Sequence, residues 1–166
     1  MSDQGSSIHK GKCTCGHVSY RLTSDPLFVH CCHCTWCQRE TGTAFALNAI
    51  IESDRVDLLS GEVEIVDTPS ASGKGQRISR CPICRVAVWS NYGGSGDLAR
   101  FIRVGTLLDS HRFSPDVHIF SSTKLPWVVI DDGAPVFEEY YSSKELWPEA
   151  SLERRRAMIA KQKGTG

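Results

Sequence analysis

The sequence predicts a mainly β fold in a single domain, followed by a short C-terminal helix. Short apolar or alternating runs separated by turn residues recur between residues 17 and 141. A helical pattern begins only near the end of the chain. The length of 166 residues suffices for one real core but is short for two. We therefore expect a flexible arm at 1–10, a β domain at 11–141 and a helical tail at 142–166.

The first strands flank the most cysteine-rich part of the chain. Residues 1–10 lack an apolar period, and 11–16 form a turn bracketed by glycines. Apolar and polar residues then alternate over 18–22, as they do in a half-buried strand. After Asp25-Pro26, the apolar residues 27–29 predict a second strand, which leads directly into Cys-Cys-His-Cys-Thr-Trp-Cys.

Later elements follow from further apolar runs and turn residues. Residues 38–42 predict a turn or a single helical turn, and 69–75 a surface loop. Ser151 can cap a helix beginning at Leu152. Further strands are expected, with an Asp-Asp-Gly hairpin turn between the last two, at 43–51, 56–59, 62–67, 76–79, 86–90, 98–104, 117–120, 127–130 and 136–141.

Composition restricts the compartment and the partners. Nineteen basic and nineteen acidic residues balance, so no nucleic-acid partner is expected. No apolar run approaches the ~20 residues of a membrane span, and the first ten residues do not resemble a signal peptide. We expect a cytoplasmic protein without membrane contact, and a homodimer is compatible with the sequence. In a reducing compartment, closely spaced cysteines more often bind metal than form disulfides.

Two of the three cysteine groups predict a structural zinc site. Cys13 and Cys15 lie in one turn, and Cys81 and Cys84 lie in another. Together they supply four thiolates, the number that closes a tetrahedral zinc site and leaves no position for substrate. Such a site would pin two distant turns and contribute to folding. The alternative is two unrelated pairs of buried free thiols.

The third group predicts a catalytic zinc site. Cys32, Cys34 and Cys37 supply three thiolates, and three protein ligands with one open position are typical of catalytic zinc. Cys31 leaves alternatives open, because it could replace Cys32 or act as a fourth ligand. Neighbouring residues of an extended chain point to opposite faces, which favours Cys32. A thiolate-rich shell suits the capture of a soft sulfur ligand, so a small thiol is the expected substrate.

These motifs resemble the glutathione-dependent formaldehyde-activating enzyme family, which includes centromere protein V. The resemblance covers residues 11–140 and rests on the two cysteine pairs with their glycines, the run Cys32-His-Cys-x-x-Cys-Gln, Gly42, and the later landmarks Gly105-Thr-Leu, His118-Ile and Trp127. The chain departs from the family pattern at Arg80, at Arg85, where the family usually has glycine, and by adding Cys31.

The resemblance implies a zinc-binding β sandwich similar to methionine sulfoxide reductase B, with two zinc ions per chain, one structural and one catalytic. It implies carbon–sulfur lyase chemistry on an adduct such as S-hydroxymethylglutathione, with glutathione as the thiol. We nominate His118 as proton donor, with His111 or solvent as alternatives. Two other functions stay open: a non-catalytic zinc-stabilised binding module, and a thiol-disulfide or sulfoxide reductase that uses Cys31 or Cys32.

Overall fold

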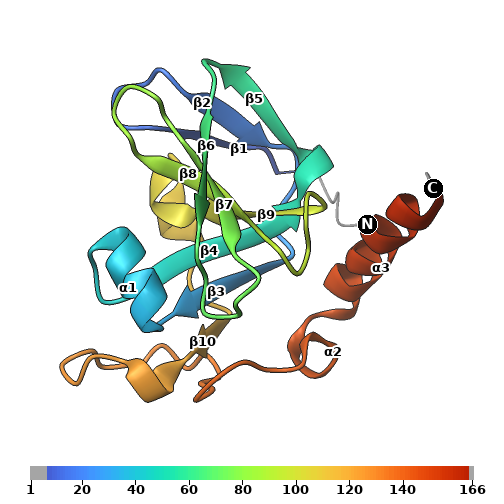
Figure 1. The fold of residues 1–166 in the computed structure, drawn as a ribbon. Helices are drawn as coiled ribbons and strands as arrows, with labels where there is room; N and C mark the ends of the chain where they lie inside the picture. Colours follow the sequence, from blue (N-terminus) through green and yellow to red (C-terminus); the bar gives the residue numbers. More distant parts are fainter. Residues whose placement is uncertain (1–6, 165–166) are drawn as a thin grey trace.

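Two β-sheets and a C-terminal helix make up the described part of the chain. The structure, a computed structural model, describes residues 7–164. The small antiparallel sheet has the order β1-β2-β5, from His9–Lys12, Ser19–Leu22 and Val56–Ser60. Figure 1 shows it at the top of the molecule, away from the C-terminal helix α3 (Glu149–Gly164). None of the helices within 7–164 is long and apolar enough to cross a membrane.

The large sheet has seven strands and carries the candidate site. Its spatial order is β10-β3-β4-β9-β8-β7-β6, and every pair is antiparallel except β10 with β3. The strands, in chain order, are β3 (Phe28–Cys32), β4 (Ala46–Glu52), β6 (Glu64–Thr68), β7 (Gln76–Arg80), β8 (Ala87–Tyr92), β9 (Ala99–Arg103) and β10 (Val117–Ile119).

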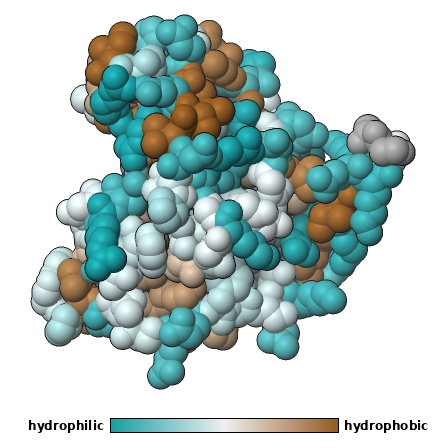
Figure 2. Space-filling model, in the orientation of Figure 1, coloured by the Kyte–Doolittle hydropathy of each residue, from teal (hydrophilic) through white to brown (hydrophobic). Residues whose placement is uncertain are grey.

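Apolar side chains cover both faces of the large sheet because its strands alternate. One core cluster joins Tyr20 and Leu22 of the small sheet to Ile51, Trp89 and Ile102 of the large one. A second cluster lies on the opposite face, where residues of β3, β4 and β10 pack against the C-terminal segment. The fold therefore has three layers, with the large sheet in the middle, the small sheet on one of its faces and the C-terminal segment on the other. The exterior in Figure 2 is mostly polar, with separate apolar patches, one at the top where the small sheet lies.

Short helices complete the chain. The helix α1 (Thr35–Thr41) follows β3 and ends at Gly42, whose φ of 69° is a left-handed value that favours glycine. The helix α2 (Ser143–Leu146) precedes α3. Single 3₁₀ turns occur at Ser53–Arg55, Val104–Thr106, Ser110–Arg112 and Ser121–Thr123.

The predicted strands between residues 18 and 120 are present, with ends shifted by a few residues, but several details were wrong. Residues 1–6 of the predicted arm lie outside the described residues, and His9 and Lys10 belong to β1. His9 is buried and bonds Asp25 and Asp109 through its two ring nitrogens, each at 2.7 Å. Of the turn or single helical turn predicted at 38–42, the helical alternative is present, as the end of the longer helix α1.

The predicted strands at 127–130 and 136–141, and the hairpin between them, do not form. Trp127 and Val129 are exposed, and only Val136 makes an isolated bridge, to His118. An apolar run was not sufficient to form a strand at either place. The edge strand β10 has only three residues, and Pro135, just before the second run, has no N–H to donate. Ser151 does not cap the helix, which begins at Glu149; its hydroxyl donates to the Leu27 carbonyl at 2.7 Å.

A tight packing contact predicts the sensitivity of β1. A Cβ atom at Gly11 would lie 2.2 Å from Cζ of the fully buried Tyr20, whose hydroxyl is tied to Thr106 Oγ1 at 2.6 Å. We expect Gly11→Ala to lower the free energy of unfolding by about 1–3 kcal/mol, because the ring must shift within a packed core. Urea unfolding at fixed zinc concentration measures this loss.

Gly105→Ala is the matched control, since nothing lies within 4 Å of the added Cβ at Gly105. Its expected change is within about 0.5 kcal/mol. Equal stability of the two variants would contradict the packing argument.

Candidate metal centres and the adjoining cavity

All eight cysteines are free thiols, and their sulfurs fall into separate groups. The sulfurs of Cys13, Cys15, Cys81 and Cys84 all lie within 4.8 Å of one another. The Cys13–Cys15 and Cys15–Cys81 sulfur distances are 3.6 Å and 3.7 Å. A tetrahedral ion with Zn–S bonds of ~2.3 Å sets its sulfurs about 3.8 Å apart, so these two distances fit zinc.

Backbone geometry prepares this four-cysteine group for a cation. The Val18 N–H donates to Cys13 Sγ at 3.3 Å. Backbone N–H groups of Cys15 and Val86 lower the pKa of Cys84 to about 6, which favours its thiolate at neutral pH. Arg85 adopts a left-handed φ of 65°, the value for which a glycine is the usual residue. The turn that carries Cys81 and Cys84 therefore forms although Arg85 stands where a glycine is usual.

The four-cysteine group also joins the two sheets. Cys13 and Cys15 follow β1, whereas Cys81 and Cys84 lie in the turn between β7 and β8. Cys13 and Cys81 are both almost fully buried in the core cluster shared by the sheets. An ion bound here would link the small sheet to the large one.

The sulfurs of Cys32, Cys34 and Cys37 form a second group within 4.8 Å. Cys32 ends β3, Cys34 is the N-cap of α1, and Cys37 lies in the first turns of that helix. The Cys37 N–H donates to Cys34 Sγ at 3.3 Å. Cys31 is not part of this group, because the pleat of β3 directs it to the opposite face.

Hydrogen bonds within this group favour the thiolate form of Cys34. Hydrogen bonds from the thiols of Cys32 and Cys37, followed by backbone N–H groups at the helix N-terminus, lower the pKa of Cys34 to about 2. The same contact raises the pKa of Cys32, the donor. Three thiolates held this close would repel one another unless a divalent cation shared them, so the donor set suits zinc.

Arg103 supplies a buried positive charge beside the three sulfurs. Its guanidinium donates to Asn48 Oδ1 at 2.5 Å and to Ser90 Oγ at 3.0 Å, and its charge opposes the overall rise in the pKa of Cys37. A three-thiolate zinc group has a net negative charge, which this cation compensates. Sequence analysis did not identify this role, although alternation along β9 places Arg103 on the same face as Phe101.

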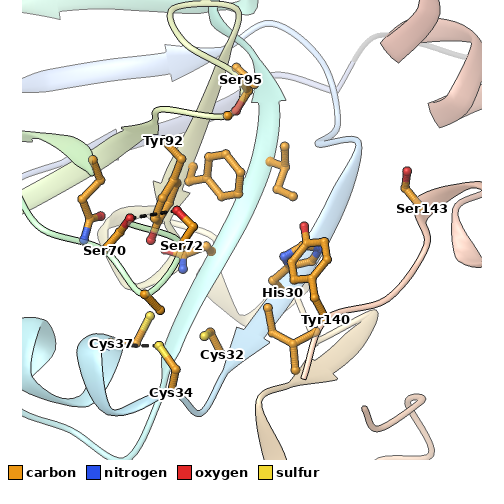
Figure 3. A pocket seen from close by; sticks show the side chains of 18 of the residues that line it. His30, Cys32, Cys34, Cys37, Ser70, Ser72, Tyr92, Ser95, Tyr140 and Ser143 are labelled. Carbon is orange, nitrogen blue, oxygen red and sulfur yellow. Dashed lines mark hydrogen bonds between the residues drawn. The ribbon is translucent and has the colours of Figure 1, made fainter. Parts of the chain in front are cut away.

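The three sulfurs open into a cavity of about 530 Å³. Figure 3 shows Cys32, Cys34 and Cys37 at one end of it, His30 and Tyr140 beside them, and Tyr92 with Ser70 and Ser72 across from them. The volume is typical of sites for small molecules. The loop at 69–75, predicted as a plain surface loop, contributes residues to the lining of this cavity.

The cavity has an apolar wall and a cationic rim. Leu27, Ile50, Phe101 and Trp147 are among its apolar lining residues. Lys74 and Arg155 line it as well, and none of the lining residues in the described part of the chain is acidic. The C-terminal segment contributes Tyr140, Tyr141, Ser143, Trp147, Arg155 and Met158.

His30 is a cavity residue that sequence analysis missed. It lies two residues before Cys32 on β3, so both side chains face the same side of the sheet, and this spacing was the available signal. Burial lowers the pKa of His30 to about 4, so the ring is neutral at pH 7. Its Nε2 lies 2.5 Å from the Tyr141 hydroxyl, which also accepts a 2.6 Å hydrogen bond from Trp147 Nε1.

His118, nominated as proton donor, lies outside the cavity lining. Its ring nitrogens bond His33 Nε2 at 2.9 Å and Asp132 Oδ2 at 2.8 Å. Cys31 Sγ lies 3.6 Å from the same His33 nitrogen. His111 lies in an exposed 3₁₀ turn outside the cavity lining.

The two sheets and the two cysteine groups define a mainly β protein with thiolate sites suited to zinc. Residues 8–123 match the family model described as glutathione-dependent formaldehyde-activating enzyme. The chain belongs to this family. The structure also resembles the crystal structure of a Rhodobacter sphaeroides protein, a structural genomics target, with a TM-score of 0.46 and 16% identity over 77% of this chain and 99% of that one.

Removal of one sulfur tests the linking role of the four-cysteine group. We expect Cys81→Ser to lose one equivalent of zinc and more than about 4 kcal/mol of unfolding free energy, because metal affinity at such a site contributes to folding. Zinc content and thermal unfolding measure the two losses.

Ile83→Ser is the control, because Ile83 lies between the two cysteines of that turn but is 64% exposed. It should retain the zinc and change stability by no more than about 0.5 kcal/mol. A Cys81→Ser protein with wild-type stability would exclude the linking role.

Proposed function

We propose that this protein is a zinc-dependent carbon–sulfur lyase that forms or cleaves the adduct of a small thiol with an aldehyde, such as S-hydroxymethylglutathione. The observation that carries this proposal is the placement of three cysteine sulfurs at the end of a cavity with a cationic rim. The family name supports glutathione and formaldehyde as the reacting pair.

The two cysteine groups take different roles in this proposal. Cys13, Cys15, Cys81 and Cys84 hold a structural ion, since four sulfurs leave it no free position. Cys32, Cys34 and Cys37 hold the catalytic ion, with one position open toward the cavity. When bound there, zinc supplies a Lewis-acidic centre that favours the thiolate form of a sulfur.

The protein's own residues bind and orient the adduct. The apolar wall at Leu27, Ile50 and Phe101 excludes water from the reacting carbon and sulfur. Glutathione has two carboxylates and a single ammonium group, so it is anionic at neutral pH. Lys74 and Arg155 are positioned on the lining to bind these carboxylates, and no acidic side chain on the described lining opposes them.

Formation or cleavage of the carbon–sulfur bond requires a proton to move at the hydroxymethyl oxygen. His30 and Tyr140 line the cavity and are the groups we propose to hold that proton. Burial lowers the pKa of His30 to about 4, so its ring is neutral at pH 7 and would hold the proton by hydrogen bonding rather than carry it as a cation. The predicted proton-donating role of His118 stays a prediction, and its position outside the cavity lining lends it no support.

Loss of one cavity sulfur should abolish turnover without unfolding the protein. We expect Cys34→Ser to lose one equivalent of zinc relative to wild type and to reduce kcat/KM for S-hydroxymethylglutathione by at least about 10³-fold, because the metal shell is incomplete. Zinc content, steady-state kinetics and circular dichroism measure the three properties.

Wild-type turnover by a Cys34→Ser protein that has lost one equivalent of zinc would refute the catalytic role of the Cys32, Cys34 and Cys37 group. Wild-type protein that retains all its zinc but turns over no thiol–aldehyde adduct would instead favour the zinc-stabilised binding module. An intramolecular disulfide that forms during turnover would favour the reductase.

Arg155 tests the charge of the substrate. We expect Arg155→Ala to raise KM for S-hydroxymethylglutathione about tenfold, since a charge-assisted hydrogen bond contributes about 1.5 kcal/mol or more. KM for the uncharged adduct of 2-mercaptoethanol should stay close to wild type.

Arg156→Ala is the control, because Arg156 is exposed, pairs with Glu149 at 2.6 Å and does not line the cavity. Equal effects of Arg155→Ala on the charged and uncharged adducts would show that the residue shapes the cavity without reading charge.

A further inference from the structure

We propose that Cys31, His33 and His118 form a third metal site, which takes a zinc-class cation and is separate from both cysteine groups described above. The three donor atoms, one sulfur and two imidazole nitrogens, all lie within 4.8 Å of one another. A thiolate and imidazoles are ligands that zinc prefers.

The sheet brings these residues together on the face opposite the cavity. Cys31 of β3 and His118 of β10 are direct partners in the parallel register. Alternation places Cys32 and Ile119, the next pair, on the cavity side. The backbone of His33 continues the pairing, since its N–H donates to the Ile119 carbonyl at 3.0 Å. Its ring consequently returns to the side of Cys31.

The separations of the donor atoms match a tetrahedral ion. Bonds of ~2.3 Å to sulfur and ~2.0–2.1 Å to nitrogen place these donors about 3.6 Å apart, and two nitrogens about 3.3 Å apart. Cys31 Sγ lies 3.6 Å from His33 Nε2, which lies 2.9 Å from His118 Nδ1. The two nitrogens need to separate by only about 0.4 Å to accept the ion.

Hydrogen bonding around the group orients its donor atoms toward one another. Without an ion, the N–H at His33 Nε2 donates to His118 Nδ1 and lies near Cys31 Sγ, and a bound cation would take the place of that hydrogen. Asp132 Oδ2 accepts from His118 Nε2 at 2.8 Å, which leaves Nδ1 with its lone pair toward His33. A carboxylate behind a histidine in this way is typical of metal-binding histidines.

Burial predicts that an ion held by these residues exchanges slowly. Cys31, His33 and His118 are 1%, 0% and 5% exposed. The ring of Phe45 packs edge-on against His33 at 5.5 Å between centroids. None of the three residues lines the cavity, so an ion held by them would not meet the substrate.

Metal counting on the full-length protein tests the site. After loading with zinc and removal of free metal, we expect one more equivalent in wild type than in Cys31→Ser. After loading with cobalt(II), the difference spectrum between these proteins should have the charge-transfer intensity of a single thiolate. The Cys34→Ser protein should instead lose the more intense absorption of a three-thiolate group. This contrast separates the third site from the proposed catalytic one.

Asp132→Asn is the second variant, because Asp132 is partly exposed and contributes no ligand. It should fold normally and bind the third equivalent about 10–100-fold more weakly in competition with a chelator. Equal metal content of wild type, Cys31→Ser and Asp132→Asn, with superimposable cobalt spectra, would overturn the proposal. If Cys31→Ser does not fold, chelator competition between wild type and Asp132→Asn decides the question.

Discussion

The pleat of β3 organises the chemistry of this protein. Successive side chains on a strand point to opposite faces, so His30 and Cys32 face the cavity, with Phe28 on the same side of the sheet, while Val29 and Cys31 face the other way. A shift of one residue in the pairing of β3 with β4 would exchange these sets. The sulfur that reaches α1 would then be Cys31, and the histidine beside it would be lost from the cavity. Five residue pairs between β3 and β4 fix the register and so prevent this exchange.

Local patterns in the sequence were sufficient for most of the β structure and for the grouping of the cysteines. Alternation over 18–22 predicted β2, and sulfur counting paired the turn at Cys13 with the turn at Cys81, which the structure brings within metal-binding distance. The same counting left Cys31 ambiguous until its neighbours across the sheet were known. His9 shows the limit of periodicity, because the strand that carries it is held by carboxylates from two later loops.

The parts that sequence reasoning missed depend on contacts between distant segments. Arg103 is an ordinary basic residue in a strand pattern, and only its contacts with Asn48 and Ser90 reveal a buried charge near thiolates. The apolar run at 127–130 has the composition of a strand but pairs with neither sheet. His118 was nominated as a proton donor from the sequence alone, but the direction of its ring depended on β10 pairing in parallel with β3.

The wall of the cavity that comes from the tail has an architectural consequence. The family model ends at residue 123, whereas Tyr141, Trp147 and Arg155 on the lining come later in the chain. The three cavity sulfurs thus lie within the part of the chain that matches the family model, whereas part of the cavity wall lies beyond it. Substitutions in the tail can change substrate specificity while both sheets and all the cysteines stay in place. Related chains with the same cysteine groups therefore need not share a substrate.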